Sequence, residues 1–283
     1  MTATKGKPMQ KIVSRKKATL DIQAHVITPD IAAAWLDKNV NNRNRQKRSV
    51  DKYARDMANR NWKLSGDPIR FDEHGVLLDG QHRLAACVQA GVPFESVVIY
   101  GIKAEAKNTI DTGKPRSMAD VLTMQGMHYA NVTASIARIL LDEKYGVEDN
   151  VAWSHQDLMG MIERHPRIHA VAREVHMSKL PRGIRNAQIG AIVLIGSTLL
   201  SAENSAAAWF DVFRTGVPSS DNCPAHQMRE KLLRSNIGAT LLKRREAWRG
   251  IKTAWNLFVQ GKTTTRLRWS GPVEIEGLDR DKL

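Results

Sequence analysis

The spacing of hydrophobic residues divides the chain into a mixed first part and a helical second part. Alternating or continuous apolar runs in the first part predict four short strands, at residues 20–27, 68–71, 76–78 and 96–101. Thr28 followed by Pro29 is typical of a helix start, and the apolar residues of 49–59 recur at helical spacing. Residues 80–90 predict a turn and a helix that Gly91 ends.

The second part begins with a helix start and continues almost entirely as helix. Ser117 and Asp120 have the spacing of a capping box, which favours a helix beginning there. The apolar run from Ile189 to Leu200 predicts a buried helix. Periodicity predicts helices around residues 130–145, 154–164, 167–177, 185–203, 205–214 and 225–261.

This order of elements predicts an α+β protein of two domains. We expect a basic flexible arm over residues 1–18, followed by an α/β domain over 19–125. An all-helical domain over 126–270 and a tail over 271–283 complete the expected organisation.

The net charge of +14 points to a polyanionic partner, usually nucleic acid. The excess is concentrated in three segments. Residues 1–17 carry six basic and no acidic residues, while 41–63 and 229–252 each carry eight basic and two acidic residues. Such clustering favours binding faces over a uniformly basic surface.

The two cysteines, Cys87 and Cys223, form no CxxC pair and no metal-binding spacing. We interpret both as free thiols of a cytoplasmic protein. The basic N-terminus has no apolar stretch behind it, so we expect no signal peptide. No apolar run is long enough to cross a bilayer, so we expect no membrane partner.

The segment Asp79-Gly80-Gln81-His82-Arg83 lies between a predicted strand and a predicted helix. A glycine in such a turn allows a ligand to approach the backbone, and a helix N-terminus attracts anions. Arg83 is a permanent donor that suits phosphate, and His82 adds a donor or a titratable group. These residues alone fit a phosphate site and an ordinary surface turn equally well.

The run from Trp62 to Tyr100 resembles the N-terminal domain of the ParB/sulfiredoxin superfamily, particularly ParB-like proteins of phages and bacteria that carry a DGQHR motif. The resemblance extends over about residues 20–122, and its most specific string is Asp79-Gly80-Gln81-His82-Arg83-Leu84-Ala85-Ala86. It implies a ParB/sulfiredoxin-like nucleotide-binding domain. CTP or ATP would bind at Gly80, Gln81, His82 and Arg83.

The chain departs from both families at Gln81. Sulfiredoxin has its catalytic cysteine at this position, so we expect no sulfinic acid reduction. ParB has a glutamate important for CTP hydrolysis there, and glutamine is no general base at neutral pH. The resemblance therefore implies nucleotide binding and leaves hydrolysis in doubt.

Two flanking segments would complete the site in the resembled family. Arg43 and Arg45 lie where ParB-like proteins place an arginine-bearing box. Asp111 and Arg116 lie where ParB closes on nucleotide and metal, so Asp111 is a candidate Mg²⁺ ligand and Arg116 a candidate phosphate contact. Asp111 as a turn cap and Arg116 as a surface residue are the structural alternatives.

The predicted last helix carries an apolar stripe that includes Ile251 and Trp255, and a basic face on its other side. Such a face can follow the phosphates of DNA. The segment from Lys262 to Trp269 extends it, with Trp269 as a candidate for stacking on a base. The residues expected to bind DNA are Lys243, Arg244, Arg245, Arg249 and Lys252.

These patterns predict a nucleotide-binding, DNA-associated protein of phage or mobile-element type. We expect it to act as a nucleotide-dependent switch or clamp, and a homodimer is possible. One alternative is a nuclease or an ATP-dependent enzyme of the same superfamily, including a weak NTPase, with Asp79 and Asp111 as the candidate catalytic carboxylates. The other is a DNA-binding protein with a vestigial nucleotide pocket.

Overall fold

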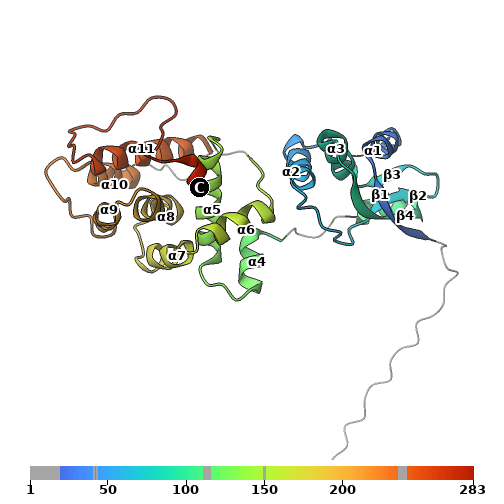
Figure 1. Cartoon of the computed structure of the whole chain (residues 1–283), viewed down its shortest axis with the longest axis horizontal. Helices are drawn as coiled ribbons and strands as arrows, with labels where there is room; N and C mark the ends of the chain where they lie inside the picture. The colour runs from blue at the N-terminus through green and yellow to red at the C-terminus, as the bar shows by residue number, and fades with distance from the viewer. Residues whose placement is uncertain (1–19, 41, 43, 111–115, 149–150, 235–240) are drawn as a thin grey trace, which may run out of the picture. The chain divides into compact units, whose positions relative to one another are not determined.

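The computed structural model describes residues 20–40, 42, 44–110, 116–148, 151–234 and 241–283 (Figure 1). The chain divides into two units, Met1–Gly113 and Lys114–Leu283. Each has its own cluster of buried hydrophobic residues. A small mixed sheet in the first unit and helices in both confirm the α+β class.

The first unit contains a four-stranded sheet in the order β1-β4-β2-β3. Its strands are β1 (Asp21–Ile27), β2 (Ile69–Asp72), β3 (Leu77–Asp79) and β4 (Phe94–Ile102). β1 runs antiparallel to β4, with Asp21 opposite Tyr100 and Ile27 opposite Phe94. β2 runs parallel to β4 and antiparallel to β3, which brings Asp79 opposite Arg70. All four predicted strands are therefore confirmed within a few residues.

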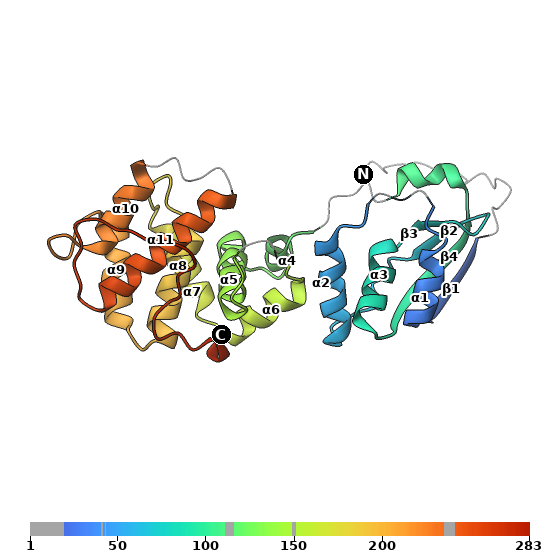
Figure 2. The ribbon, with the colours of Figure 1, turned by 90° about the horizontal axis from the view of Figure 1, so that it is seen from above.

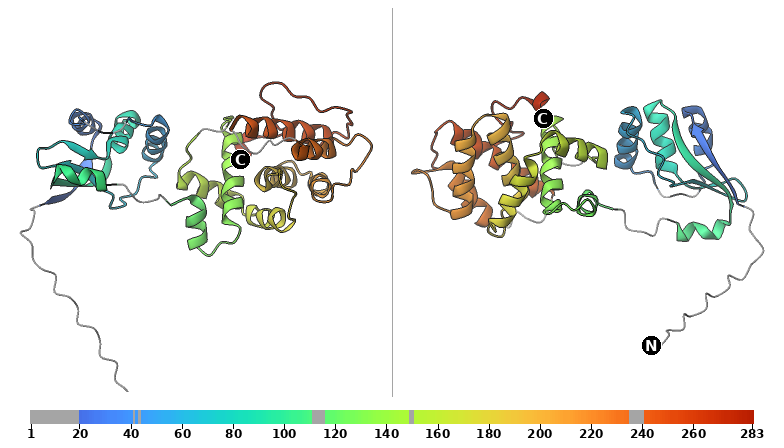
Figure 3. Two further views of the ribbon diagram at one scale, coloured as in Figure 1. Left: turned by 180° about the vertical axis from the view of Figure 1, so that it is seen from behind. Right: turned by 60° about the horizontal axis from the view of Figure 1, so that its bottom comes forward.

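Three helices, α1 (Pro29–Leu36), α2 (Lys47–Ala58) and α3 (Gln81–Ala90), lie side by side over the sheet, with α3 between the other two (Figures 1 and 3). The short η1 (Ala104–Thr109) follows β4. Phe71 and Val98 from the strands and Leu84 from α3 belong to one buried cluster. This packing fixes the position of α3, whose first residue follows β3 and Gly80.

Local sequence signals account for the ends of these helices. The Thr28 hydroxyl accepts a hydrogen bond from the backbone N–H of Ile31, and Pro29 occupies the first helical position, as predicted. Gly91 ends α3 in the left-handed conformation at φ 67°, which confirms it as the C-terminal glycine.

The regular elements of the second unit are all helical in the residues that the structure describes. Its longest helix, α11, follows α10 after residues 235–240, which lie outside the described ranges. Its elements are α4 (Met118–Met124), α5 (Ala130–Lys144), α6 (His155–Arg164), α7 (Ile168–Met177), α8 (Asn186–Leu194), the π-helical turn η2 (Ile195–Leu199), α9 (Glu203–Thr215), α10 (Pro224–Arg234), α11 (Leu241–Val259) and the short η3 (Arg280–Lys282).

The apolar helix α8 forms the centre of this unit and packs against α5, α7, α9 and α11 (Figure 2). Every residue from Gln188 to Ile195 is buried, which confirms the predicted buried helix. Gly196 follows, where a Cβ atom would lie 2.6 Å from the indole of Trp255. The glycine therefore allows Trp255 of α11 to pack against η2.

Two predicted domain boundaries are wrong. We expected the first domain to end at residue 125, but α4 belongs to the second unit because Met118 and Leu122 are buried in its core. The expected tail of 271–283 is also part of that core, since Ile275 and Leu283 are buried there. The basic arm predicted over residues 1–18 lies outside the described residues.

One predicted helix is interrupted, because the helix expected over 185–203 changes at Leu194 into the π-helical turn η2. Within the range 225–261 the structure describes α10 and α11, and residues 235–240 between them lie outside the described residues. Among the described residues, no helix is both long and apolar enough to span a membrane.

Candidate functional site

The Asp79–Arg83 segment forms the predicted strand, turn and helix start. Gly80 links β3 to α3 with φ 105°, a left-handed conformation that side chains strongly disfavour. A Cβ atom at this position would also lie 2.3 Å from Cδ1 of the buried Ile69. The turn therefore requires glycine for both its backbone conformation and its packing.

A hydrogen bond places the start of α2 beside the start of α3. The backbone N–H of Gln46, the N-cap of α2, donates to Nε2 of His82 at 3.0 Å. Within the described structure, neither helix has a capping side chain or an acidic residue in its first turn. Each N-terminus carries a partial positive charge from its backbone N–H groups, so the pair suits an anionic ligand.

His82 acts in this contact as a hydrogen-bond acceptor. Because Nε2 accepts the hydrogen bond from Gln46, that nitrogen carries no proton in this arrangement. The neutral ring then holds its proton on Nδ1, where it can donate. The contact fixes the orientation of the imidazole at the second residue of α3.

A chain of side-chain amides ties the segment before α2 to the turn. The amide nitrogen of Asn42 donates to Oδ1 of Asn39 at 2.6 Å and to the carbonyl oxygen of Leu77 at 2.8 Å. The amide nitrogen of Asn39 donates to Oε1 of Gln81 at 3.0 Å. Gln81 is only 5% exposed and its side chain holds this segment in place, so its contact with a nucleotide stays a prediction.

Arg83 is also engaged inside the unit. Its guanidinium donates to the carbonyl oxygens of Asp67 and Pro68, the latter at 2.8 Å. It also lies 3.3 Å from the carboxylate of Asp79, and its side chain is 12% exposed. These contacts hold the segment before β2 against α3. The guanidinium of Arg83 is engaged by these groups, and its contact with a phosphate stays a prediction.

Asp79, a candidate catalytic carboxylate, lies between two guanidinium groups. Oδ2 is 2.5 Å from Arg70 and 3.3 Å from Arg83. These two ion pairs hold the Asp79 carboxylate inside the unit, where it orients both arginines.

The flanking candidate residues are only partly described. Arg45 is exposed and directly precedes Gln46, so it lies at the paired helix starts. Arg116 is exposed and belongs to the second unit. Arg43 and Asp111 lie outside the described residues. In the described part of the chain, no group of three or more His, Cys, Asp or Glu side chains could hold a metal ion.

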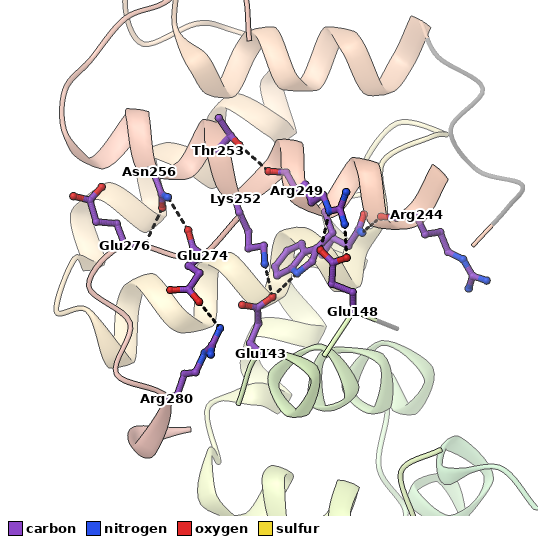
Figure 4. A network of polar contacts seen from close by, with 12 residues as sticks. Glu143, Glu148, Arg244, Arg249, Lys252, Thr253, Asn256, Glu274, Glu276 and Arg280 are labelled. Atoms are coloured by element: carbon purple, nitrogen blue, oxygen red, sulfur yellow. Dashed lines mark hydrogen bonds and ion pairs between the residues drawn. The ribbon is translucent and has the colours of Figure 1, made fainter. Parts of the chain in front are cut away.

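The basic face predicted on α11 is partly turned inward (Figure 4). Arg249 donates through Nε to Oε1 of Glu148 at 2.7 Å and also pairs with Glu246 at 3.0 Å. Nζ of Lys252 lies 2.8 Å from Oε1 of Glu143, and Lys252 is only 5% exposed.

The assignment of Arg249 and Lys252 to a solvated DNA-binding face is therefore wrong, because carboxylates at and beyond the end of α5 engage both. Arg244 and Arg245 are half-buried, and the side chain of Lys243 lies outside the described part.

The sequence patterns did not identify Asn39, Asn42 and Gln46. These residues form hydrogen bonds with Gln81, with the carbonyl of Leu77 and with His82, respectively. The available signal was the run from Asn39 to Gln46, in which Val40 is the single apolar residue. Its side-chain amides can satisfy backbone groups and other amides where no regular structure does so.

No family model, curated protein or solved structure matched the chain. The relationship to the ParB/sulfiredoxin superfamily therefore stays a prediction that rests on the residues around Asp79 to Arg83.

Proposed function

We propose that the first unit binds a nucleoside triphosphate, CTP or ATP, with its phosphates at the paired starts of α2 and α3. The observation that carries this proposal is the hydrogen bond from Gln46 to His82, which holds two helix N-termini together without an acidic side chain in either described first turn. Two such N-termini attract an anion more strongly than one.

The residues of the turn divide into contacts and supports. His82 lies at this point, and Arg45 beside it is exposed, so we assign the phosphate contact to these two side chains. Gln81 and Arg83 keep the turn in shape through their contacts with Asn39 and with the carbonyl of Pro68. Mg²⁺ would accompany the triphosphate and neutralise part of its charge. Asp111 remains the candidate ligand for that ion.

The proposed role is a nucleotide-dependent switch that associates with DNA. Lys47 and Arg48 of the basic segment 41–63 lie in the described first turn of α2. A triphosphate between the starts of α2 and α3 would change the position of this basic helix. The coupling between the two ligands is reciprocal. The factor by which nucleotide changes DNA affinity equals the factor by which DNA changes nucleotide affinity.

The test is isothermal titration calorimetry with ATP, CTP, GTP and UTP in the presence of Mg²⁺. We expect one nucleotide to bind the wild type and to bind at least tenfold more weakly to Arg45→Ala and to His82→Ala. Lys63→Ala is the matched control, since Lys63 is an exposed cation of the same unit that is not at the turn. Arg83→Ala is less informative because it removes internal contacts of the fold.

Failure of all four nucleotides to bind a folded wild-type protein would overturn the proposal. It would then favour a DNA-binding protein with a vestigial pocket. An enzyme is the less supported alternative, because Asp79 is engaged by Arg70 and Arg83. Turnover that is lost in Asp111→Ala while nucleotide binding persists would favour the enzyme. The homodimer stays a prediction.

A further inference from the structure

A groove on the helical unit gathers three exposed cations, Lys231, Arg266 and Arg268. It has a volume of about 610 Å³ and is bounded by α10, α11 and the segment that follows α11. Its lining residues are Lys231, Glu246, Arg266, Leu267, Arg268, Trp269 and Ser270.

Exposed and buried side chains alternate along the segment from Arg266 to Trp269. Leu267 is 6% exposed and belongs to the hydrophobic core, whereas Arg266 and Arg268 on either side of it are exposed. Upstream, the backbone N–H of Thr264 donates to the carbonyl of Asn222 at 3.1 Å. The core contact therefore presents two arginines from a chain segment that is fixed at both ends.

Trp269 forms the floor of the groove. Its indole Nε1 donates to Oε2 of Glu246 at 2.9 Å. The ring crosses α11 at Gly250, where a Cβ atom would lie 2.6 Å from Cη2. Nζ of Lys231 lies 4.0 Å from the centroid of the indole, a cation–π contact that positions the ammonium over the ring.

Two arginines of the groove, Arg266 and Arg268, remain available to a ligand. Its acidic residue, Glu246, uses Oε1 to accept from Arg249 and Oε2 to accept from Trp269. Neither Arg266 nor Arg268 forms an ion pair with any residue that the structure describes. This distinguishes them from Arg249 and Lys252 of α11, which internal carboxylates hold.

We propose that this groove binds the phosphodiester backbone of nucleic acid through Lys231, Arg266 and Arg268. The inference deepens the proposed function, because it assigns the DNA association to a surface other than the predicted face of α11. Since Lys231 covers the indole and Glu246 engages its N–H, Trp269 positions a cation instead of stacking on a base. Binding through phosphates alone is independent of base sequence.

The experiment measures the affinity of the full chain, without nucleotide, for fluorescein-labelled 20-mers by fluorescence anisotropy. Single-stranded DNA, duplex DNA and single-stranded RNA are each titrated across a range of salt concentrations. Each lost phosphate contact is expected to reduce the slope of log K against log salt by about 0.9 for duplex DNA. The double variant Arg266→Ala/Arg268→Ala should therefore lower the slope by about 1.8. If both proteins bind equally at 1 M salt, the affinity of the variant at 0.1 M salt should be roughly 60-fold lower than that of the wild type.

Two variants control for charge and folding. Arg173→Ala/Arg182→Ala removes the same charge from two exposed positions of the same unit outside the groove and should retain the wild-type slope. Arg266→Lys/Arg268→Lys keeps the charges and should retain most of the affinity. Thermal melting of each variant confirms that it folds.

An unchanged salt slope in the alanine variant, or an equal loss in the Arg173/Arg182 control, would overturn the groove as the binding surface. Binding to anionic phospholipid vesicles but to none of the three nucleic acids would overturn the class of partner. Nucleotide titration of the Arg266/Arg268 variant separates the two proposals. The groove stands if nucleic acid binding depends on it even when no nucleotide binds.

Discussion

At the scale of single residues, Gly80 shows how a sequence signal and a structural requirement coincide. The signal was a glycine between an apolar strand and an amphipathic helix, and the requirement is a φ of 105° against the side chain of Ile69. The turn carries His82 and the start of α3. A change at Gly80 should therefore affect both folding and the proposed site.

We predict that Gly80→Ala lowers the free energy of unfolding by roughly 3 kcal/mol, through backbone strain and overpacking together. Gly75→Ala is the matched control, because Gly75 also has a positive φ, of 79°, but no atom lies within 4 Å of its Cβ position. We expect that variant to lose about 1 kcal/mol from strain alone. Urea unfolding measures both values, and equal losses would contradict the packing argument.

Cys87 gives a prediction that depends on pH. Burial raises the pKa of its thiol to about 11. At pH 8 the thiolate fraction is then roughly a hundredth of that of a thiol with a pKa near 9, so iodoacetamide should label folded Cys223→Ala protein about a hundredfold more slowly than unfolded protein. Labelling of the folded protein at the unfolded rate would show that the thiol is accessible.

The raised pKa of Cys87 also makes the stability of the fold depend on pH. The folded state keeps the thiol neutral at pH values at which the unfolded chain has ionised it. The contribution of Cys87 to stability is therefore complete below the unfolded pKa and is lost as the pH rises toward 11. A Cys87→Ala variant should lack this part of the pH dependence.

Residue-level roles were harder to predict than residue-level geometry. The glycine, the N-cap Thr28 and the capping box at Ser117 depend on neighbours within four positions, and all three are confirmed. The roles of Gln81 and Arg83 depend on partners 42 and 16 positions away along the chain. No local pattern contains those partners, so both side chains were assigned to a ligand.

At the scale of elements, the buried pair Glu143–Lys252 joins α5 to α11. Oε1 of Glu143 accepts from Lys252 at 2.8 Å and from the indole of Trp248 at 2.7 Å. The polar face of α11 has helical spacing, and the sequence indicated solvent on that side. Helical periodicity separates apolar from polar faces, but it does not distinguish a polar face in water from one that packs against carboxylates.

We predict that Glu143→Gln lowers the free energy of unfolding by about 3–5 kcal/mol, because it leaves the ammonium of Lys252 buried without a counter-charge. The double variant Glu143→Gln/Lys252→Met should recover most of this loss, since neither charge is then buried. Chemical unfolding of the wild type, both single variants and the double variant gives the coupling energy. Additive effects would mean that the pair does not interact.

At the scale of the whole molecule, the two units have separate cores, and the division falls earlier than the sequence indicated. The motif resemblance and the mixed pattern both ran past residue 113, so α4 was assigned to the first domain. Its apolar residues Met118 and Leu122 fit either core by hydrophobicity. Only packing on α5 identifies the unit to which the helix belongs.

The separate cores allow a direct test of whether nucleotide binding acts as a switch. Hydrogen–deuterium exchange of the full chain with and without nucleotide should show slower exchange at the starts of α2 and α3 if the proposed site is correct. A switch also requires that the protein has two conformations and that the nucleotide binds one of them more tightly than the other. We therefore expect exchange to change in the helical unit as well.

The variants assign each part of that response. His82→Ala should remove the nucleotide effect in both units, because it acts on the binding step. Arg266→Ala/Arg268→Ala should keep both effects, because it alters only the proposed nucleic acid groove. Protection confined to the first unit would show that the nucleotide binds without communicating with the second unit. DNA binding by the groove that is indifferent to nucleotide would then follow from the separate cores, and a switch that acts on the groove would be contradicted while the nucleotide site remained.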